Sequence, residues 1–179
     1  MREVGAVSSI DVRRGRSKAK WRREVASRVS TNWLEVIPRD PFFVPTLKSG
    51  KAALKVVREL APDASDVKVV HTGNVEFVSA MGNFEAIHCP SCGAELSMDW
   101  FGETMSQVYD ATRFDSLDIV VPCCGQASSL NDLDYSWPQG FARWYISARD
   151  PGRGWLSDAE EQRIADALGV PVRTVLAHL

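Results

Sequence analysis

All four cysteines of this 179-residue chain lie in two short turns, and this arrangement restricts the possible folds more than any other feature. The first turn has the sequence Cys89-Pro90-Ser91-Cys92-Gly93, and the second has Val121-Pro122-Cys123-Cys124-Gly125. When both are aligned on their shared Pro-x-Cys-Gly frame, Cys92 matches Cys124 and Val121 takes the position of Cys89. Paired cysteines in a chain without a secretory signal are typical of metal binding in the reducing cytoplasm. We therefore expect a cytoplasmic protein whose fold brings the two turns together.

The spacing of these cysteines predicts a zinc site. A Cys-x-x-Cys-Gly turn suits zinc because the glycine permits a tight turn and both sulfurs can lie about 2.3 Å from a tetrahedral ion. Cys89, Cys92 and Cys124 are well-placed ligands. We prefer Cys123 as the fourth ligand, although adjacent cysteines can share one ion only on a bent backbone. His88 is an alternative fourth ligand, and an open fourth position or a metal-free pair of turns is also compatible with the pattern.

A structural role for the metal is favoured over a catalytic one. A catalytic zinc needs a vacant coordination position and a nearby base. Glu95, Asp132 and Asp134 are candidate bases, but no His-Glu-x-x-His or deaminase-type zinc motif accompanies them. Thiol redox chemistry at Cys89 and Cys92 would require a helix N-terminus that lowers a thiol pKa, and no clear helix follows this turn.

The net charge of −2 conceals two different kinds of surface. Residues 1–30 carry nine Lys/Arg and three Asp/Glu, which predicts a disordered basic arm. This arm would bind nucleic acid or an acidic partner, or would be a translated leader before a start at Val29. Residues 71–135 carry ten acidic side chains and a single basic one, Arg113. Because such a surface repels phosphates, we expect no nucleic-acid partner there and expect a protein partner at the acidic segment.

On each side of the cysteine region the sequence repeats the order strand, helix, strand. In the first unit, residues 33–37 and 67–71 are the expected strands. Between them, Thr46 can cap a helix that Pro62 stops. The apolar face of this helix consists of Leu47, Leu54, Val57 and Leu60.

The second unit follows the same order. Residues 141–147 and 172–178 are the expected strands, and Ser157 to Glu160 form a predicted capping box. The helix carries Ile164, Ala165 and Leu168 on one face and ends at Gly169. Arg-Asp-Pro follows the first strand of each unit, at residues 39–41 and 149–151. The triplets indicate turns, with a pseudo-symmetric pair of Arg/Asp sites as the alternative.

Two such units predict an α+β protein with a ferredoxin-like, split βαβ sandwich. The expected organisation is an arm at 1–30, a first half at 31–71, a zinc-ribbon-like insertion at 72–138 and a second half at 139–179. Within the insertion we expect a hairpin of residues 75–78 and 84–88, a helix at 99–112 and a strand at 117–121. Aromatic residues at 135–145 would pack between the insertion and the sandwich, or form a partner-binding surface. No apolar run approaches the roughly 20 residues of a membrane helix.

The cysteine region resembles zinc ribbons, a class built from two such turns. Residues 32–179 also resemble a family of small uncharacterised bacterial proteins. The shared features are the Cys89 to Cys92 turn, the Pro122 to Gly125 turn and the stretch from Trp137 to Arg143. The resemblance implies no known activity. We therefore expect a non-enzymatic zinc-binding protein that acts as a protein-binding or adaptor module. The alternative is a small-ligand enzyme or sensor that uses a cleft between the insertion and the sandwich.

Overall fold

The computed structural model describes residues 31–179, and the predicted arm at 1–30 lies outside these described residues. Within the described range the protein is a mixed α+β structure with three α-helices and three antiparallel sheets. The helices are α2 (Leu47–Leu60), α3 (Met98–Thr112) and α4 (Asp158–Leu168), with one 3₁₀ turn, η1 (Leu130–Asp132). The strands are β1 (Asn32–Pro38), β2 (Asp66–Val78), β3 (Ile87–His88), β4 (Glu95–Leu96), β5 (Asp118–Val120), β6 (Ala127–Ser129), β7 (Asp134–Tyr135), β8 (Gly140–Arg149) and β9 (Val172–His178).

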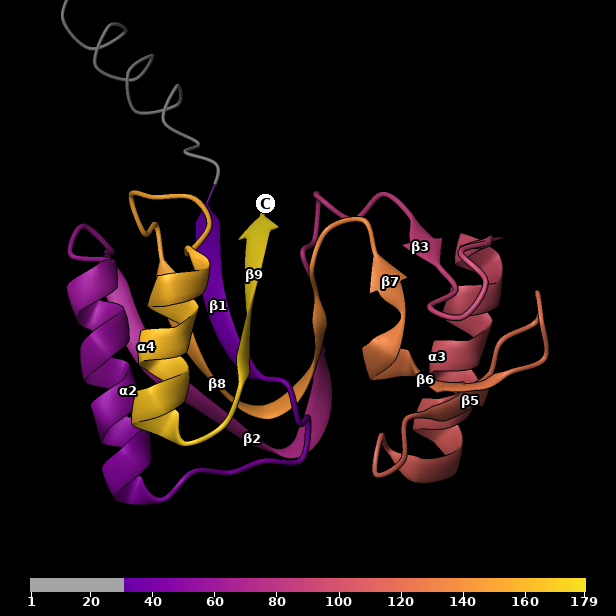
Figure 1. Ribbon diagram of the computed structural model, residues 1–179, viewed down its shortest axis with the longest axis horizontal. Coiled ribbons are helices and arrows are strands. Elements are labelled where there is room, and N and C mark those ends of the chain that lie inside the picture. Colours follow the sequence, from indigo (N-terminus) through magenta and orange to yellow (C-terminus); the bar gives the residue numbers. More distant parts are fainter. Residues whose placement is uncertain (1–30) are drawn as a thin grey trace, which may run out of the picture. The chain divides into compact units, whose positions relative to one another are not determined.

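The largest sheet has the strand order β2-β8-β1-β9, and every neighbouring pair in it is antiparallel (Figure 1). Helices α2 and α4 lie side by side against this sheet (Figure 1). Their core contains Leu34 and Val36 from β1, Val57 from α2 and Ile164 from α4. Because side chains alternate between the faces of a strand, Leu34 and Val36 face the helices and Glu35 lies on the opposite face.

The ends of both sandwich helices are as the sequence predicts. The Thr46 side chain accepts a hydrogen bond from the Ser49 amide at the start of α2. At α4, Ser157 and Glu160 form a complete capping box, and Gly169 ends the helix at a φ of 92°. These caps satisfy backbone groups that a helix end leaves unpaired, which is why they are visible in the sequence.

The two Arg-Asp-Pro triplets act as turns. The Asp40 carboxylate accepts a hydrogen bond from the Phe42 amide at 2.9 Å, just beyond the end of β1. The Asp150 amide instead donates to the Asn32 carbonyl at 2.7 Å, at the start of β1. The triplets therefore lie at opposite ends of the same strand, where their hydrogen bonds fit turns, and the alternative of paired Arg/Asp sites stays a prediction.

Strand β2 is much longer than the predicted strand at 67–71. It pairs with β8 from Asp66 to His71, shifts register, and pairs again from Glu76 to Val78. Gly73, at a φ of 79°, lies within the shift and permits the irregular backbone. The predicted hairpin of residues 75–78 and 84–88 is wrong, because Val78 pairs with Gly140 and Ile87 pairs with Leu96 and Tyr135.

The far ends of β2 and β8 carry a second core, which connects the sandwich to the cysteine region. Phe141 is fully buried there, and its ring lies 5.0 Å from that of Phe77 and 5.3 Å from that of Phe114. Phe101 of α3 and Tyr135 of β7 complete an aromatic cluster with ring centroids 6.0 Å apart. Of the aromatic residues at 135–145, Tyr135 and Phe141 thus pack at this junction as expected, whereas Trp144 packs in the core of the sandwich. Cys89 and Val121 are also buried in this core.

Glu35 is a half-buried carboxyl group in the middle of the sandwich sheet. Its Oε1 accepts a hydrogen bond from the Ser147 hydroxyl at 3.0 Å, and its buried Oε2 has no partner among the described residues. Burial raises the pKa of Glu35 from 4.5 to about 7, although Ser147 and the charge of Lys68 act in the opposite direction. The folded protein therefore favours the protonated carboxyl group.

Because the folded-state pKa of Glu35 is above its unfolded value, the folded protein is most stable while Glu35 is protonated. This contribution to the free energy of unfolding is fully present below about pH 4.5 and is lost as the pH rises through about 7. We expect Glu35→Gln to increase the free energy of unfolding at about pH 8 by on the order of 2 kcal/mol, with little change at about pH 4.5. Urea denaturation of both proteins across this range measures the effect. The exposed Glu85→Gln is the control, and equal pH profiles for wild type and Glu35→Gln would contradict the assignment.

Candidate metal centre

The two cysteine turns have the same backbone structure. In the first, the Gly93 amide donates to the Cys89 carbonyl at 2.9 Å and the Cys89 amide donates to the Ala94 carbonyl at 2.9 Å. In the second, the Gly125 amide donates to the Val121 carbonyl at 2.9 Å and the Val121 amide donates to the Gln126 carbonyl at 3.0 Å. Gly93 and Gly125 have φ values of 73° and 69°, which strongly favour glycine.

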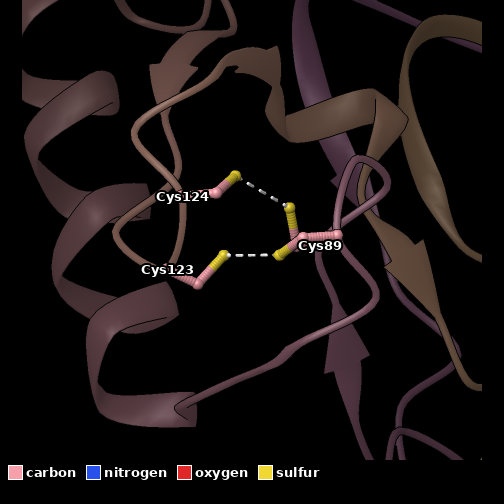
Figure 2. A group of neighbouring side chains, drawn as sticks. Cys89, Cys123 and Cys124 are labelled. Atoms are coloured by element: carbon pink, nitrogen blue, oxygen red, sulfur yellow. Dashed lines mark hydrogen bonds between the residues drawn. The ribbon is translucent and has the colours of Figure 1, made fainter.

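This shared pattern places Val121 at the backbone position of Cys89 and Cys124 at the position of Cys92. Val121 is fully buried in the aromatic core and supplies no ligand. The missing sulfur is supplied by Cys123, one residue before Cys124. Figure 2 shows Cys123 and Cys124 projecting from one turn toward Cys89 on the other.

The four sulfur atoms form one compact group. All four Sγ atoms lie within 4.8 Å of one another. The Cys89 and Cys124 sulfurs are 3.7 Å apart, and the Cys92 and Cys123 sulfurs are 3.4 Å apart (Figure 2). The chain thus brings the four cysteines together from two turns that are about thirty residues apart in sequence.

Two of these sulfur distances are close to those expected around a tetrahedral metal ion. With zinc–sulfur bonds of about 2.3 Å, tetrahedral ligands are about 3.8 Å from one another. The two measured contacts are within a few tenths of an ångström of this distance. The four cysteines could therefore hold one metal ion without a large movement of the backbone.

The electrostatics of the group favour a bound cation. Burial raises the pKa of the Cys89 thiol, but hydrogen bonds from the backbone amides of Cys92 and Ser91, together with those from Cys123 and Cys92, lower it to about 6. For Cys123, burial and the neighbouring Cys92, Cys89 and Cys124 together raise the pKa to about 12. A second thiolate is thus disfavoured beside the first, and a divalent cation removes this repulsion.

The other predicted candidates are not part of this group. His88 lies in β3, between Glu95 of β4 and Asp134 of β7, and it does not belong to the cluster of potential ligands. The structure thus groups the four cysteines without His88, and which side chain is the fourth ligand stays a prediction. Glu95, Asp132 and Asp134 are also outside the cluster, and Asp132 and Asp134 instead line a separate cavity.

The turn that contains Cys89 and Cys92 lacks the local structure of a redox motif. It is followed by strand β4, and α3 begins only at Met98. Its stabilising amide donors belong to Ser91 and Cys92, and these backbone groups could not be assigned from residue types alone. The glycine at the fifth position of each turn is the sequence feature that predicts a tight turn whose backbone amides point toward the cysteine sulfurs.

Comparison of the chain with protein-family models, with curated proteins and with solved structures finds no match. Within residues 31–179, none of the helices combines the length and apolar character needed to cross a membrane. The interpretation of the site therefore depends on its own geometry and chemistry.

Proposed function

We propose that this protein binds one structural zinc ion through Cys89, Cys92, Cys123 and Cys124 and acts as a cytoplasmic, non-enzymatic protein-binding module. The observation that carries the proposal is the approach of all four sulfurs to within 4.8 Å of one another. Zinc is favoured over other metals because four thiolates in a tetrahedral arrangement are its common structural ligand set. Iron bound by the same four sulfurs is the competing outcome of metal analysis.

A structural role agrees with the number of ligands. Four cysteine ligands fill the four positions of a tetrahedral ion, so no position is left for a substrate or an activated water. The zinc-ribbon-like character of the region is supported by the two matching turns. The ferredoxin-like character of the sandwich is supported by its strand order β2-β8-β1-β9 with α2 and α4 against it.

Metal analysis tests the zinc assignment directly. We expect protein purified without added zinc to contain about one equivalent of zinc, because a closed thiolate site binds it with an apparent free energy of about 10–16 kcal/mol. Ser91→Ala, which changes an exposed residue of the same turn, should retain the full amount. Mass spectrometry of the metal content would contradict the proposal if the protein contained no zinc or an equivalent of iron.

The surface proposed for the partner is helix α3. Phe101 is the one buried residue of this 15-residue helix. Met98 and Tyr109 are 45% and 46% exposed, and Asp99, Glu103 and Asp110 are exposed acidic residues. A surface with apolar side chains among carboxylates fits a partner with basic and apolar groups. The acidic segment would thus recognise a basic protein surface.

Site-specific photo-crosslinking in cells tests this surface. A crosslinking amino acid at Glu103 should form a discrete adduct, whereas the same residue at the exposed Lys51 on α2 should form none. The adduct should diminish when Asp99 and Asp110 are replaced by asparagine, because electrostatic attraction would be weakened. Equal adducts at Glu103 and Lys51, or no adduct at Glu103, would argue against a binding role for α3.

A further inference from the structure

A second candidate site lies away from the cysteines, where β9 and α4 face the segment that contains η1 and β7. A cavity of about 470 Å³ is present there. This volume is within the range of about 300–1,000 Å³ that is usual for small-molecule sites. The side chains that line it include Arg39, Asp132, Asp134, Trp155, Glu161 and Arg173.

Arg173 is held rigidly in the wall of this cavity. Its Nη1 donates to the Gln139 carbonyl at 2.6 Å, and both Nη atoms donate to the Asn131 carbonyl at 3.2 and 3.3 Å. Asn131 is itself buried and fixed, because its side chain donates to the Arg39 carbonyl and accepts from the Phe141 amide. The acceptors of Arg173 are therefore neutral carbonyl groups, which orient the guanidinium group without cancelling its charge.

Arg39 adds a second positive charge to the same cavity. Its Nε donates to the Val172 carbonyl at 3.2 Å, and its two Nη atoms have no acceptor among residues 31–179. Burial and the neighbouring charge of Arg39 lower the pKa of Arg173, whereas the charges of Tyr135, Asp132 and Glu161 raise it. The partly desolvated guanidinium group of Arg173 thus lies near the exposed guanidinium group of Arg39.

The carboxylates around the cavity do not neutralise this pair. Within residues 31–179, neither Arg39 nor Arg173 has a carboxylate oxygen within 4.0 Å. The Oε1 atom of Glu161 accepts hydrogen bonds from the amide and hydroxyl of Thr174. Asp132 and Asp134 are exposed to solvent, so they weaken the positive potential of the cavity without pairing with either arginine.

We propose that this cavity binds a small organic molecule with one anionic group, a carboxylate or a phosphate monoester, through the guanidinium groups of Arg39 and Arg173. Planar guanidinium groups bind both kinds of oxyanion in a bidentate manner. The ring of Trp155, 41% exposed and 5.4 Å from the ring of Trp137, offers an apolar surface for the rest of the ligand. The three nearby carboxylates disfavour ligands with several negative charges.

Calorimetric titration of the zinc-loaded full-length chain tests the site with four probes: acetate, benzoate, inorganic phosphate and phenyl phosphate. We expect benzoate or phenyl phosphate to bind with a Kd of about 1 mM or tighter. Benzoate should bind more tightly than acetate, and phenyl phosphate more tightly than inorganic phosphate, because only the aromatic probes carry a ring that can contact Trp155. Preference for benzoate identifies a carboxylate ligand, and preference for phenyl phosphate identifies a phosphate ester.

Substitution of the arginines distinguishes binding in this cavity from nonspecific attraction of anions to the protein surface. Arg39 is exposed, so Arg39→Gln should fold normally and weaken binding by at least about tenfold, the loss of one charge-assisted hydrogen-bonding group. Gly140→Ala provides a second variant, because an added Cβ would lie 2.8 Å from Nη1 of Arg173 and 2.9 Å from Oδ1 of Asn131, so it should displace the guanidinium group and weaken binding. Arg163→Gln, which removes an exposed arginine paired with Glu59 on the surface, should leave binding unchanged. Absence of binding by all four probes, or equal weakening by Arg163→Gln, would overturn the proposal.

Discussion

Substitution of Cys124 by serine is expected to abolish stoichiometric zinc binding and to unfold the cysteine region locally. A serine hydroxyl is a poor zinc ligand, and the apparent free energy at stake is about 10–16 kcal/mol for a complete structural site. The strands of this region, β3, β4 and β7, have only two residues each, so they depend on the turns for their position. Hydrogen exchange should show loss of protection in α3, with α2 largely protected.

The contrast between α3 and α2 follows from the separate cores of the molecule. Phe101 of α3 packs in the core that contains Cys89 and Val121, whereas Ala53 and Val57 of α2 pack with Leu34, Trp144 and Ile146 of the sandwich sheet. Ser91→Ala is the matched control and should exchange like wild type. Undiminished protection of α3 in Cys124→Ser, with zinc retained, would show that this cysteine is not a ligand.

Truncation of Phe141 to alanine is expected to destabilise the whole protein by about 3–5 kcal/mol, the usual cost of deleting a buried aromatic ring. Phe141 is fully buried in β8, and its ring contacts Phe77 of β2 and Phe114 beyond α3. Its removal would leave a cavity between the sandwich and the cysteine region. Urea denaturation, monitored by tryptophan fluorescence, measures the change.

Phe42→Ala provides the matched control for this prediction. Phe42 is 40% exposed, and its recorded aromatic contact is the guanidinium group of Arg143, 5.6 Å from the ring centroid. We expect its loss to cost less than about 1 kcal/mol. Similar destabilisation by Phe42→Ala and Phe141→Ala would mean that the aromatic junction does not connect the two regions energetically.

The sandwich could be predicted from the sequence where its signals are local. Thr46, Ser157, Glu160 and Gly169 mark helix ends by chemistry that acts within a few residues, and the structure has helices at these positions. Strand β9 matches the predicted bounds 172–178 for the same reason. An alternating pattern identifies a strand, but it does not identify the strand's partner.

The errors in the cysteine region arise from pairing over long distances. Residues 75–78 and 84–88 are close in sequence and both apolar, which favours a hairpin when only local pattern is considered. In the structure Val78 pairs with Gly140 and Ile87 pairs with Tyr135, over separations of 62 and 48 positions. Two-residue strands such as β3 and β7 are also too short to show an alternating pattern.

The candidate sites differ in how visible they are in the sequence. Cysteine is rare in this chain and concentrated in two turns, so the cluster of four potential metal ligands could be predicted from spacing. Arg173 is one of many arginines in the chain, so nothing in the sequence marks it. Its position beside Arg39 results from the pairing of β9 with β1, in which Val172 lies opposite Pro38. The Arg-Asp-Pro triplet at residues 39–41 did single out Arg39, but chiefly as part of a turn.

X-ray absorption spectroscopy of the zinc-bound protein at the zinc K-edge would show whether the four cysteines are the ligands of the ion. Four equivalent sulfur neighbours at about 2.3 Å are predicted, because the structure groups Cys89, Cys92, Cys123 and Cys124 without His88. Cys123→Ser should reduce the number of sulfur neighbours from four to three. A nitrogen or oxygen neighbour at about 2.0–2.1 Å in the wild-type protein, or four sulfurs retained in Cys123→Ser, would contradict the account.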